Sequence, residues 1–174
     1  MKVLDKEFEV MMTQEEIDSL VSDLASKLDT EYQGKDLVIV AILNGSFIFV
    51  SDLVRKMKLD PEVIFLKYKS YKGTRSGEVK VQLELEDDIE DKHVLILEDI
   101  VDTGKTIVRI SQDLKEHEPA SLKYGTLFLK PDCYNSEVEL SFIGKELPNK
   151  FVLGYGMDYN GKGRSLNELY QLKD

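Results

Sequence analysis

Val94-Leu-Ile-Leu-Glu98-Asp99-Ile-Val-Asp102-Thr-Gly-Lys-Thr106 is the stretch of this chain that decides the fold. Its short, continuous apolar run at 94–97 is typical of a strand in a parallel sheet that is covered on both faces. Two acids end the run, and residues 103–106 predict the start of a helix. Ligands bind beyond the carboxyl ends of such strands, where acids can hold a metal or sugar hydroxyls and a helix amino terminus can bind phosphate. The pattern therefore predicts a site for a phosphorylated sugar.

Two alternatives for this stretch are a nucleotide-binding P-loop and a simple helix cap. Gly104-Lys105-Thr106 copies the end of a nucleotide-binding P-loop, but that motif needs a glycine five residues earlier. The position holds Asp99, which would place a negative charge against the phosphate. The simpler interpretation is that Asp102 or Thr103 only caps a helix. Three acids followed by Thr-Gly-Lys-Thr exceed what capping requires.

Composition indicates a globular α/β protein of one domain. The 174 residues are 42% hydrophobic, and apolar runs alternate with amphipathic stretches. No apolar run approaches the roughly 20 residues of a membrane helix, and charges interrupt residues 1–7 before a signal-peptide core could form. The net charge of −10 argues against nonspecific binding to nucleic acid or anionic lipid. The lone cysteine, Cys133, predicts neither a disulfide nor a zinc site, and we expect a cytoplasmic protein.

The order of expected elements alternates strands and helices. Thr13-Gln14-Glu15-Glu16 fits a capping box at the start of an amphipathic helix. A buried strand at 37–43 is followed by a helix at 47–57, a strand at 62–68, a loop at 70–77 and an extended arm at 79–85. Further short strands are expected at 122–129, 138–143 and 151–153. This order indicates a mostly parallel sheet with right-handed crossovers.

Residues 98–106 resemble the phosphoribosyl pyrophosphate signature of the type I phosphoribosyltransferases. Their sequence is similar to that of the family members that use hypoxanthine and guanine. The resemblance runs from about Thr13 to about Leu166, with the motifs in the order of the family. It implies a single α/β domain over residues 1–174, with a mostly parallel twisted sheet flanked by helices. It also implies a mobile flap at about 70–80 and a small hood formed by about 131–174 and the N-terminal segment.

The resemblance assigns the pyrophosphate to a turn formed by Leu43, Asn44 and Gly45, with a non-proline cis peptide bond at Leu43–Asn44. The family usually has Lys or Arg where this chain has Asn44, so one cationic contact is lost. A ligand-free Asn-Gly turn is the simpler alternative. Ser70 and Tyr71 match the flap, which would exclude water from the reaction. Without the resemblance, this segment is a solvated charged loop.

The base site is assigned in the same way. Lys130 would donate to the 6-oxo group of a purine, since an ammonium has donors and no acceptor. Phe151 would stack on the base and Val152 would present backbone groups to its edge. Asp158 would support a second magnesium ion through water, and Arg164 would bind pyrophosphate. Taken alone, Lys130 is a solvated lysine, Phe151 and Val152 are core residues, and Asp158 is a turn residue.

The reaction implied is transfer of a 5-phosphoribosyl group from phosphoribosyl pyrophosphate to N9 of hypoxanthine, and of guanine, with Mg²⁺ as cofactor. Glu98 and Asp99 would hold the ribose hydroxyls and, with Asp158, magnesium. Thr103, Gly104, Lys105 and Thr106 would bind the 5′-phosphate together with Asp102, which would also be the general base on the purine N7–H. A homodimer or homotetramer is expected. Transfer to xanthine or a pyrimidine, and a noncatalytic nucleotide sensor that binds RNA, are the alternatives.

Overall fold

A six-stranded sheet forms the centre of the computed structural model, which describes residues 1–70, 79–83 and 88–173. The strands lie in the order β5-β4-β3-β6-β7-β8. Five of them are parallel, and β5 runs antiparallel to β4. Their bounds are β3 (Leu37–Leu43), β4 (Glu62–Ser70), β5 (Val79–Leu83), β6 (His93–Val101), β7 (Ser121–Leu129) and β8 (Phe142–Glu146). The predicted α/β class with a mostly parallel sheet is confirmed.

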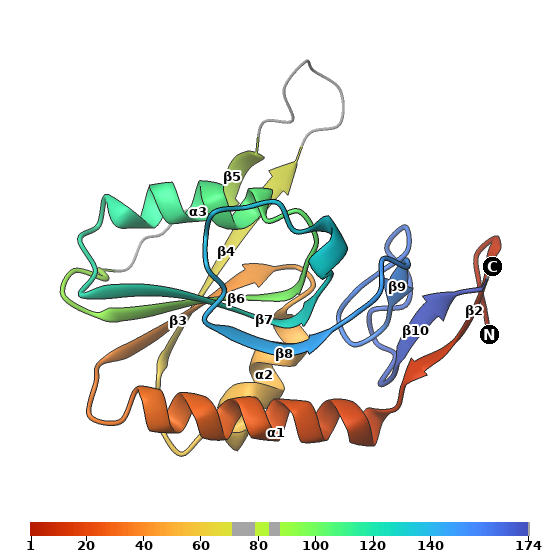
Figure 1. Ribbon diagram of the computed structural model, residues 1–174, viewed down its shortest axis with the longest axis horizontal. Coiled ribbons are helices and arrows are strands. Elements are labelled where there is room, and N and C mark those ends of the chain that lie inside the picture. The colour runs from red at the N-terminus through yellow and green to blue at the C-terminus, as the bar shows by residue number, and fades with distance from the viewer. Residues whose placement is uncertain (71–78, 84–87, 174) are drawn as a thin grey trace.

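Helices cover both faces of this sheet. Helices α1 (Gln14–Glu31) and α2 (Phe47–Lys56) lie on one face and α3 (Lys105–Lys115) on the other (Figure 1). The capping box predicted for α1 is present, because Glu16 N–H donates to Thr13 Oγ1 at 3.3 Å and Thr13 N–H donates to Glu16 Oε2 at 2.8 Å. These bonds satisfy two N–H groups that the first turn would otherwise leave without partners.

A second, smaller sheet joins the two ends of the chain. Its strands lie in the order β1-β2-β10-β9, and we call it the hood sheet. Their bounds are β1 (Lys2–Val3), β2 (Lys6–Met12), β9 (Val152–Leu153) and β10 (Leu169–Leu172). Both termini therefore lie at the same end of the molecule (Figure 1). Of these four strands, only the one at Val152–Leu153 was predicted.

The segment 131–174 divides between the two sheets. Strand β8 pairs in parallel with β7 in the large sheet, so β9 and β10 are the strands that this segment gives to the hood sheet. The strand predicted at 138–143 is observed at Phe142–Glu146. Val138 and Leu140 are partly buried against the core without pairing in the ladder, which explains why their alternation resembles that of a strand.

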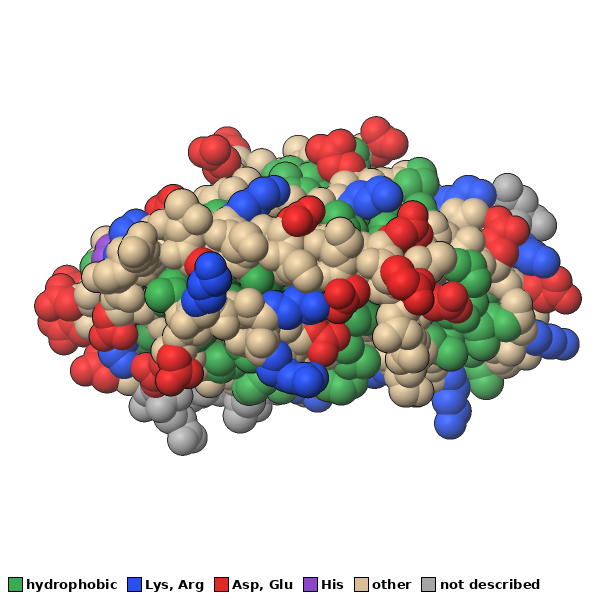
Figure 2. Space-filling view, turned by 90° about the horizontal axis from the view of Figure 1, so that it is seen from below, with side chains coloured by type: hydrophobic (Ala, Val, Ile, Leu, Met, Phe, Trp, Pro, Cys, Tyr) green, Lys and Arg blue, Asp and Glu red, His purple; other side chains and the backbone are tan. Residues whose placement is uncertain are grey.

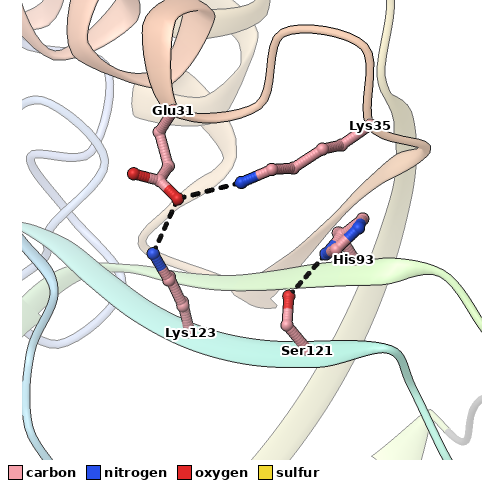
Figure 3. Close-up of polar contacts among 5 residues, drawn as sticks. All are labelled: Glu31, Lys35, His93, Ser121 and Lys123. Atoms are coloured by element: carbon pink, nitrogen blue, oxygen red, sulfur yellow. Dashed lines mark hydrogen bonds and ion pairs between the residues drawn. The ribbon is translucent and has the colours of Figure 1, made fainter.

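The amino ends of the parallel strands are joined to α1 by a polar cluster (Figure 3). Glu31, at the end of α1, accepts from Lys35 at 3.1 Å and from Lys123 of β7 at 2.8 Å. Between β6 and β7, His93 Nδ1 lies 2.8 Å from Ser121 Oγ. These contacts fix α1 and the adjacent strands at the end of the sheet opposite the predicted site.

Charged groups of both signs are interspersed on the face that carries α1 (Figure 2). No broad area of Lys and Arg is visible in this view. Within the described residues, no helix has the length and apolarity that crossing a bilayer requires.

Candidate active site

The acids of the central motif lie on the last part of β6. This strand extends to Val101, four residues beyond the apolar run, so Glu98 and Asp99 are within the strand. Its pairing with β3 stops at Leu97, whereas its pairing with β7 continues to Val101. The β3 side of β6 is therefore open beyond Leu97. This opening lies where the sheet order reverses between β3 and β6, which is the usual ligand position in such folds.

Burial dominates the electrostatics of these acids. Glu98 Oε1 is enclosed and has no hydrogen-bond partner among the described residues. Burial, followed by the charges of Asp99 and Asp102, raises the pKa of Glu98 to about 8. Burial also raises the pKa of Asp99 to about 6, although backbone N–H groups of Asp99 and Ile100 oppose the rise. A cation brought to this position would relieve the unfavourable environment of both carboxylates.

The oxygen donors at this position fit magnesium. Among the described residues, no three His, Cys, Asp or Glu side chains gather into a preformed metal cluster. Mg²⁺ commonly binds through one or two carboxylates and completes its coordination with water and substrate phosphates. The unpartnered carboxylate oxygen of Glu98 and the adjacent Asp99 meet that requirement.

The turn after β3 closes directly onto Asp99. The Leu43–Asn44 peptide bond is cis, as the resemblance implied. A Cβ atom at Gly45 would lie 1.9 Å from Asp99 Oδ2, so only glycine permits this approach. A Cβ atom at Gly156 would lie 2.0 Å from the Gly45 carbonyl oxygen, and Gly156 has a φ of +101°. Two glycines thus allow the turn to lie between the β6 acid and the 154–157 segment.

Helix α3 begins immediately after the acidic motif. Gly104 precedes it with a left-handed backbone (φ 77°), and a Cβ atom there would lie 2.7 Å from the Tyr134 ring. Asn135 N–H donates to the Thr103 carbonyl at 3.4 Å, which holds residues 134–136 against the same loop. The amino terminus of α3 therefore follows Asp102 in a tightly supported turn, an arrangement suited to an anionic group.

Lys130 and Asp102 form an ion pair across the site. Lys130 Nζ lies 3.0 Å from Asp102 Oδ1, and its side chain is 9% exposed against 55% for Asp102. Lys130 N–H also donates to the Val101 carbonyl at 3.0 Å, which fixes its backbone beside the end of β6. Sequence reasoning placed both residues in the site but not in contact with each other.

The segment from Phe151 to Arg164 forms the opposite wall. Arg164 Nη2 lies 2.6 Å from Asp158 Oδ1, and Nη1 donates to the Gly156 carbonyl at 2.6 Å. The remaining oxygen of Asp158 accepts the Gly161 N–H at 2.6 Å. Arg164 and Asp158 are thus paired with each other. Phe151 is exposed, while Val152 behind it is buried.

These groups surround one pocket of about 370 Å³. The predicted site residues that line it are Leu43, Asn44, Gly45, Glu98, Asp99, Asp102, Thr106, Lys130, Phe151, Val152, Asp158 and Arg164. Thr103, Gly104 and Lys105 are not among the lining residues; Thr103 and Gly104 form the turn after Asp102, and Lys105 is the first residue of α3. Tyr71 lies outside the described residues, and Ser70 is described only as the last residue of β4.

Sequence reasoning missed several lining residues, namely Ile42, Tyr68, Ile100 and Met157. Three of them are apolar and carry no signal beyond those of ordinary core residues. Tyr68 had a usable signal, because it is a polar aromatic at the end of an apolar strand. Its hydroxyl donates to Asp113 Oδ2 of α3 at 3.2 Å.

The sequence matches the family described as "Phosphoribosyl transferase domain" over residues 13–160. The chain belongs to the phosphoribosyltransferase family. It is 39% identical over 167 residues to a hypoxanthine-guanine phosphoribosyltransferase of Staphylococcus aureus, covering 95% of this chain and 93% of that protein. It is also 38% identical over 163 residues to the hypoxanthine phosphoribosyltransferase of Haemophilus influenzae, covering 91% of each chain.

Solved structures agree with this phosphoribosyltransferase fold. A crystal structure of a hypoxanthine phosphoribosyltransferase from Staphylococcus aureus superposes with a TM-score of 0.90 at 38% identity, covering 97% of this chain and 92% of that one. A hypoxanthine-guanine phosphoribosyltransferase from Bacillus anthracis also gives 0.90, at 29% identity, covering 98% of this chain and 100% of that one. The likeness therefore spans the whole architecture, including both sheets.

Proposed function

We propose that this phosphoribosyltransferase carries out purine salvage by transferring a 5-phosphoribosyl group from phosphoribosyl pyrophosphate to N9 of hypoxanthine and guanine, with release of pyrophosphate. The observation that carries the proposal is the Lys130–Asp102 pair, which lies in the same pocket as the β6 acids and Phe151. In this proposal the pair supplies a donor for a 6-oxo group and a proton acceptor beside the sugar-phosphate site. The relatives' names support the same base class.

The sugar phosphate is held by the β6 side of the pocket in this proposal. Glu98 and Asp99 accept hydrogen bonds from the ribose hydroxyls. Residues 103–106 bind the 5′-phosphate through backbone N–H groups at the start of α3 and through the Thr106 side chain. Backbone groups of the 43–45 turn bind the pyrophosphate. Because Asn44 adds no charge, Arg164 is the described cationic side chain that reaches pyrophosphate from the opposite wall.

Magnesium fits the acids of this pocket, with Glu98, Asp99 and Asp158 as the proposed holding residues. When bound, it neutralises charge that develops on the departing pyrophosphate. Arg164 would add a fixed positive charge beside the departing pyrophosphate once its guanidinium leaves Asp158 and binds the pyrophosphate.

The base is held between Phe151, the backbone of Val152 and the Lys130 ammonium. Lys130 donates to the 6-oxo group, and this preference disfavours adenine, which has an amino group at that position. In this proposal Lys130 exchanges its 3.0 Å contact with Asp102 for the 6-oxo group, which frees the Asp102 carboxylate. Asp102 then accepts the N7 proton as N9 attacks, so that electron density remains available to the new bond.

The test is a steady-state assay with phosphoribosyl pyrophosphate, Mg²⁺ and one base at a time. Hypoxanthine, guanine, xanthine, adenine and uracil are compared by pyrophosphate release. We expect turnover with hypoxanthine and guanine and little with adenine. Turnover with xanthine or uracil alone would move the assignment to another base class. Silence with all five would refute the enzymatic proposal and direct attention to nucleotide and RNA binding.

We also propose a cytoplasmic homodimer or homotetramer, with the Asn44 turn near the subunit contact. Phe47 supports this position, because it is an exposed aromatic residue three positions beyond Asn44. Light scattering after size-exclusion chromatography gives the mass directly. A monomer at micromolar concentration would contradict the assembly and leave the catalytic proposal intact.

A further inference from the structure

An aromatic cluster lies behind the ring that faces the proposed base site. Phe151 lines the active-site pocket and is 43% exposed, so one side of its ring is available to a ligand. Its centroid lies 6.3 Å from that of Phe8, which is fully buried. It lies 5.7 Å from the Tyr159 ring in an edge-on arrangement with an interplanar angle of 79°. Phe8 and Tyr159 are themselves 6.2 Å apart.

The hood sheet brings these rings together from both ends of the chain. Phe8 on β2 is paired with Leu172 of β10, and Leu172 N–H donates to the Phe151 carbonyl at 2.9 Å. Tyr159 belongs to a different segment, the turn in which Tyr159 and Lys162 bond to each other through their backbones. Neither Phe8 nor Tyr159 lines the pocket itself.

Tyr159 is held in place from the N-terminal hairpin. Its hydroxyl donates to Asp5 Oδ1 at 2.9 Å, and Lys6 Nζ lies 5.3 Å from its ring centroid. A cation over the face of an aromatic ring is attracted by the ring's electron density. Asp5 and Lys6 therefore fix both the tip and the face of Tyr159, and the Tyr159 ring packs against Phe151 in a T-shaped arrangement.

We propose that Tyr159 and Phe8 are positioning residues for base binding, which hold the Phe151 ring at the angle needed to stack on a 6-oxopurine. The inference rests on the proposed role of Phe151 as the stacking residue. A base gains from an aromatic platform only while the platform stays in its stacking orientation, and an exposed ring without support loses rotational freedom when the ligand binds. The rings behind Phe151 remove that freedom before binding.

Asp158 precedes Tyr159 and pairs with Arg164 at 2.6 Å. If Tyr159 supports mainly the base platform, its removal weakens binding of the base more than binding of the sugar phosphate. If it supports the whole 158–164 turn, both weaken together. The two cases differ in the ratio between the affinity for a sugar phosphate alone and the affinity for a nucleotide that also carries the base.

The experiment measures that ratio by calorimetry, as the dissociation constant of ribose 5-phosphate divided by that of inosine 5′-monophosphate. The two ligands share the sugar phosphate, so the ratio reports the base alone. We expect Tyr159→Leu to lower the ratio about fivefold, which is the size of one aromatic contact. Tyr159→Phe keeps the ring and should retain the ratio within about twofold. The KM for hypoxanthine should rise with Tyr159→Leu while the KM for phosphoribosyl pyrophosphate stays nearly constant.

Tyr170→Leu is the matched control. Tyr170 is also a partly exposed hood tyrosine that donates to a carboxylate, Glu168, but its ring lies beside Gly154. Its loss should leave the ratio unchanged. Phe8→Leu removes the other supporting ring and provides an independent variant with the same expected direction, so that either folded protein decides the outcome.

A double substitution separates this inference from the proposed function. If Tyr159 acts through Phe151, Tyr159→Leu should have no further effect on the ratio in a Phe151→Leu background. An unchanged ratio in folded Tyr159→Leu, or equal losses with and without Phe151, would overturn the positioning role. If Phe151→Leu alone leaves the ratio unchanged, or the parent protein binds both ligands equally, the base-stacking proposal itself fails.

Discussion

Asp102 is the residue on which the proposed chemistry depends most directly. Its carboxylate is half-exposed and lies 3.0 Å from Lys130 Nζ, so a side-chain movement of Lys130 exposes it to a ligand without a conformational change of the backbone. Asp102→Asn keeps the shape but cannot accept the N7 proton. We expect kcat to fall at least about 100-fold while nucleotide affinity changes by less than about threefold. Steady-state kinetics and calorimetry measure the two effects, and near-normal turnover would remove Asp102 from the mechanism.

Glu98 predicts a pH dependence of stability in the absence of divalent cations. Its pKa of about 8 exceeds the ordinary value of 4.5, so the folded chain binds the proton more tightly than the unfolded chain does. The free energy of unfolding should therefore fall as the pH rises from 4.5, the ordinary pKa, through about 8. Glu98→Gln removes the buried charge. Its Tm should exceed that of the parent by about 5 °C or more near pH 9, with little difference near pH 5.

The control for this comparison is Glu90→Gln, which neutralises an exposed carboxylate near the start of β6. Thermal unfolding in the presence of a chelator is followed across the pH range for all three proteins. Equal slopes of Tm against pH in the parent and Glu98→Gln would show that the Glu98 carboxyl is not held protonated in the folded state.

At the level of elements, the 43–45 turn depends on the absence of a side chain at Gly45. Gly45→Ala would place a Cβ atom 1.9 Å from Asp99 Oδ2, and the carboxylate is the group that can move. We expect a folded protein whose KM for phosphoribosyl pyrophosphate rises at least about 10-fold, because Asp99 and the turn both contact that substrate in the proposal. Ser51→Ala, on the exposed side of α2, should leave the KM unchanged. A parental KM in Gly45→Ala would argue that the turn does not bind this substrate.

The elements differed in how far the sequence could predict them. Strand β3 is a continuous apolar run, β4 and β7 each contain a shorter apolar stretch, and the positions of all three were predicted closely. Strand β2 reads Lys-Glu-Phe-Glu-Val-Met-Met, and it is stabilised by pairing with β10, about 160 residues later in the chain. Local pattern carries little information about such a pair. Strand β6 was predicted too short, because two partly buried acids ended the apolar run within it.

Across the whole molecule, most residues that line the pocket were predicted, but most of their mutual contacts were not. The resemblance to the phosphoribosyltransferases indicated Asp102, Lys130, Asp158 and Arg164. The ion pairs Lys130–Asp102 and Arg164–Asp158 depend on how loops from different strands meet above the sheet. Support of Phe151 by Phe8 depends further on the hood sheet, which brings together the two ends of the chain. Such contacts arise from tertiary packing and have no local signature.

The shared core of the two sheets leads to a prediction about folding. One apolar cluster contains residues of α1 and β3 together with Met12, Val152 and Leu169 of the hood sheet. Tyr155 belongs to this cluster, and its hydroxyl donates to Asp52 Oδ2 of α2 at 2.7 Å. We therefore propose that the chain unfolds as one cooperative domain, since separating the hood would expose part of the main core.

Tyr155→Phe tests this proposal by removing the bond to α2 while keeping the ring. Asp52 is partly exposed and can bind water instead, so the expected loss is about 1 kcal/mol, or a Tm lower by roughly 2–4 °C. Because the apolar cluster is intact, circular dichroism and tyrosine fluorescence should still report one coincident transition. Tyr170→Phe, which loses a hood hydroxyl contact away from α2, provides the comparison. An early transition seen by one probe in Tyr155→Phe would mean that the hood unfolds separately and that this single bond, more than the shared core, couples it to the sheet.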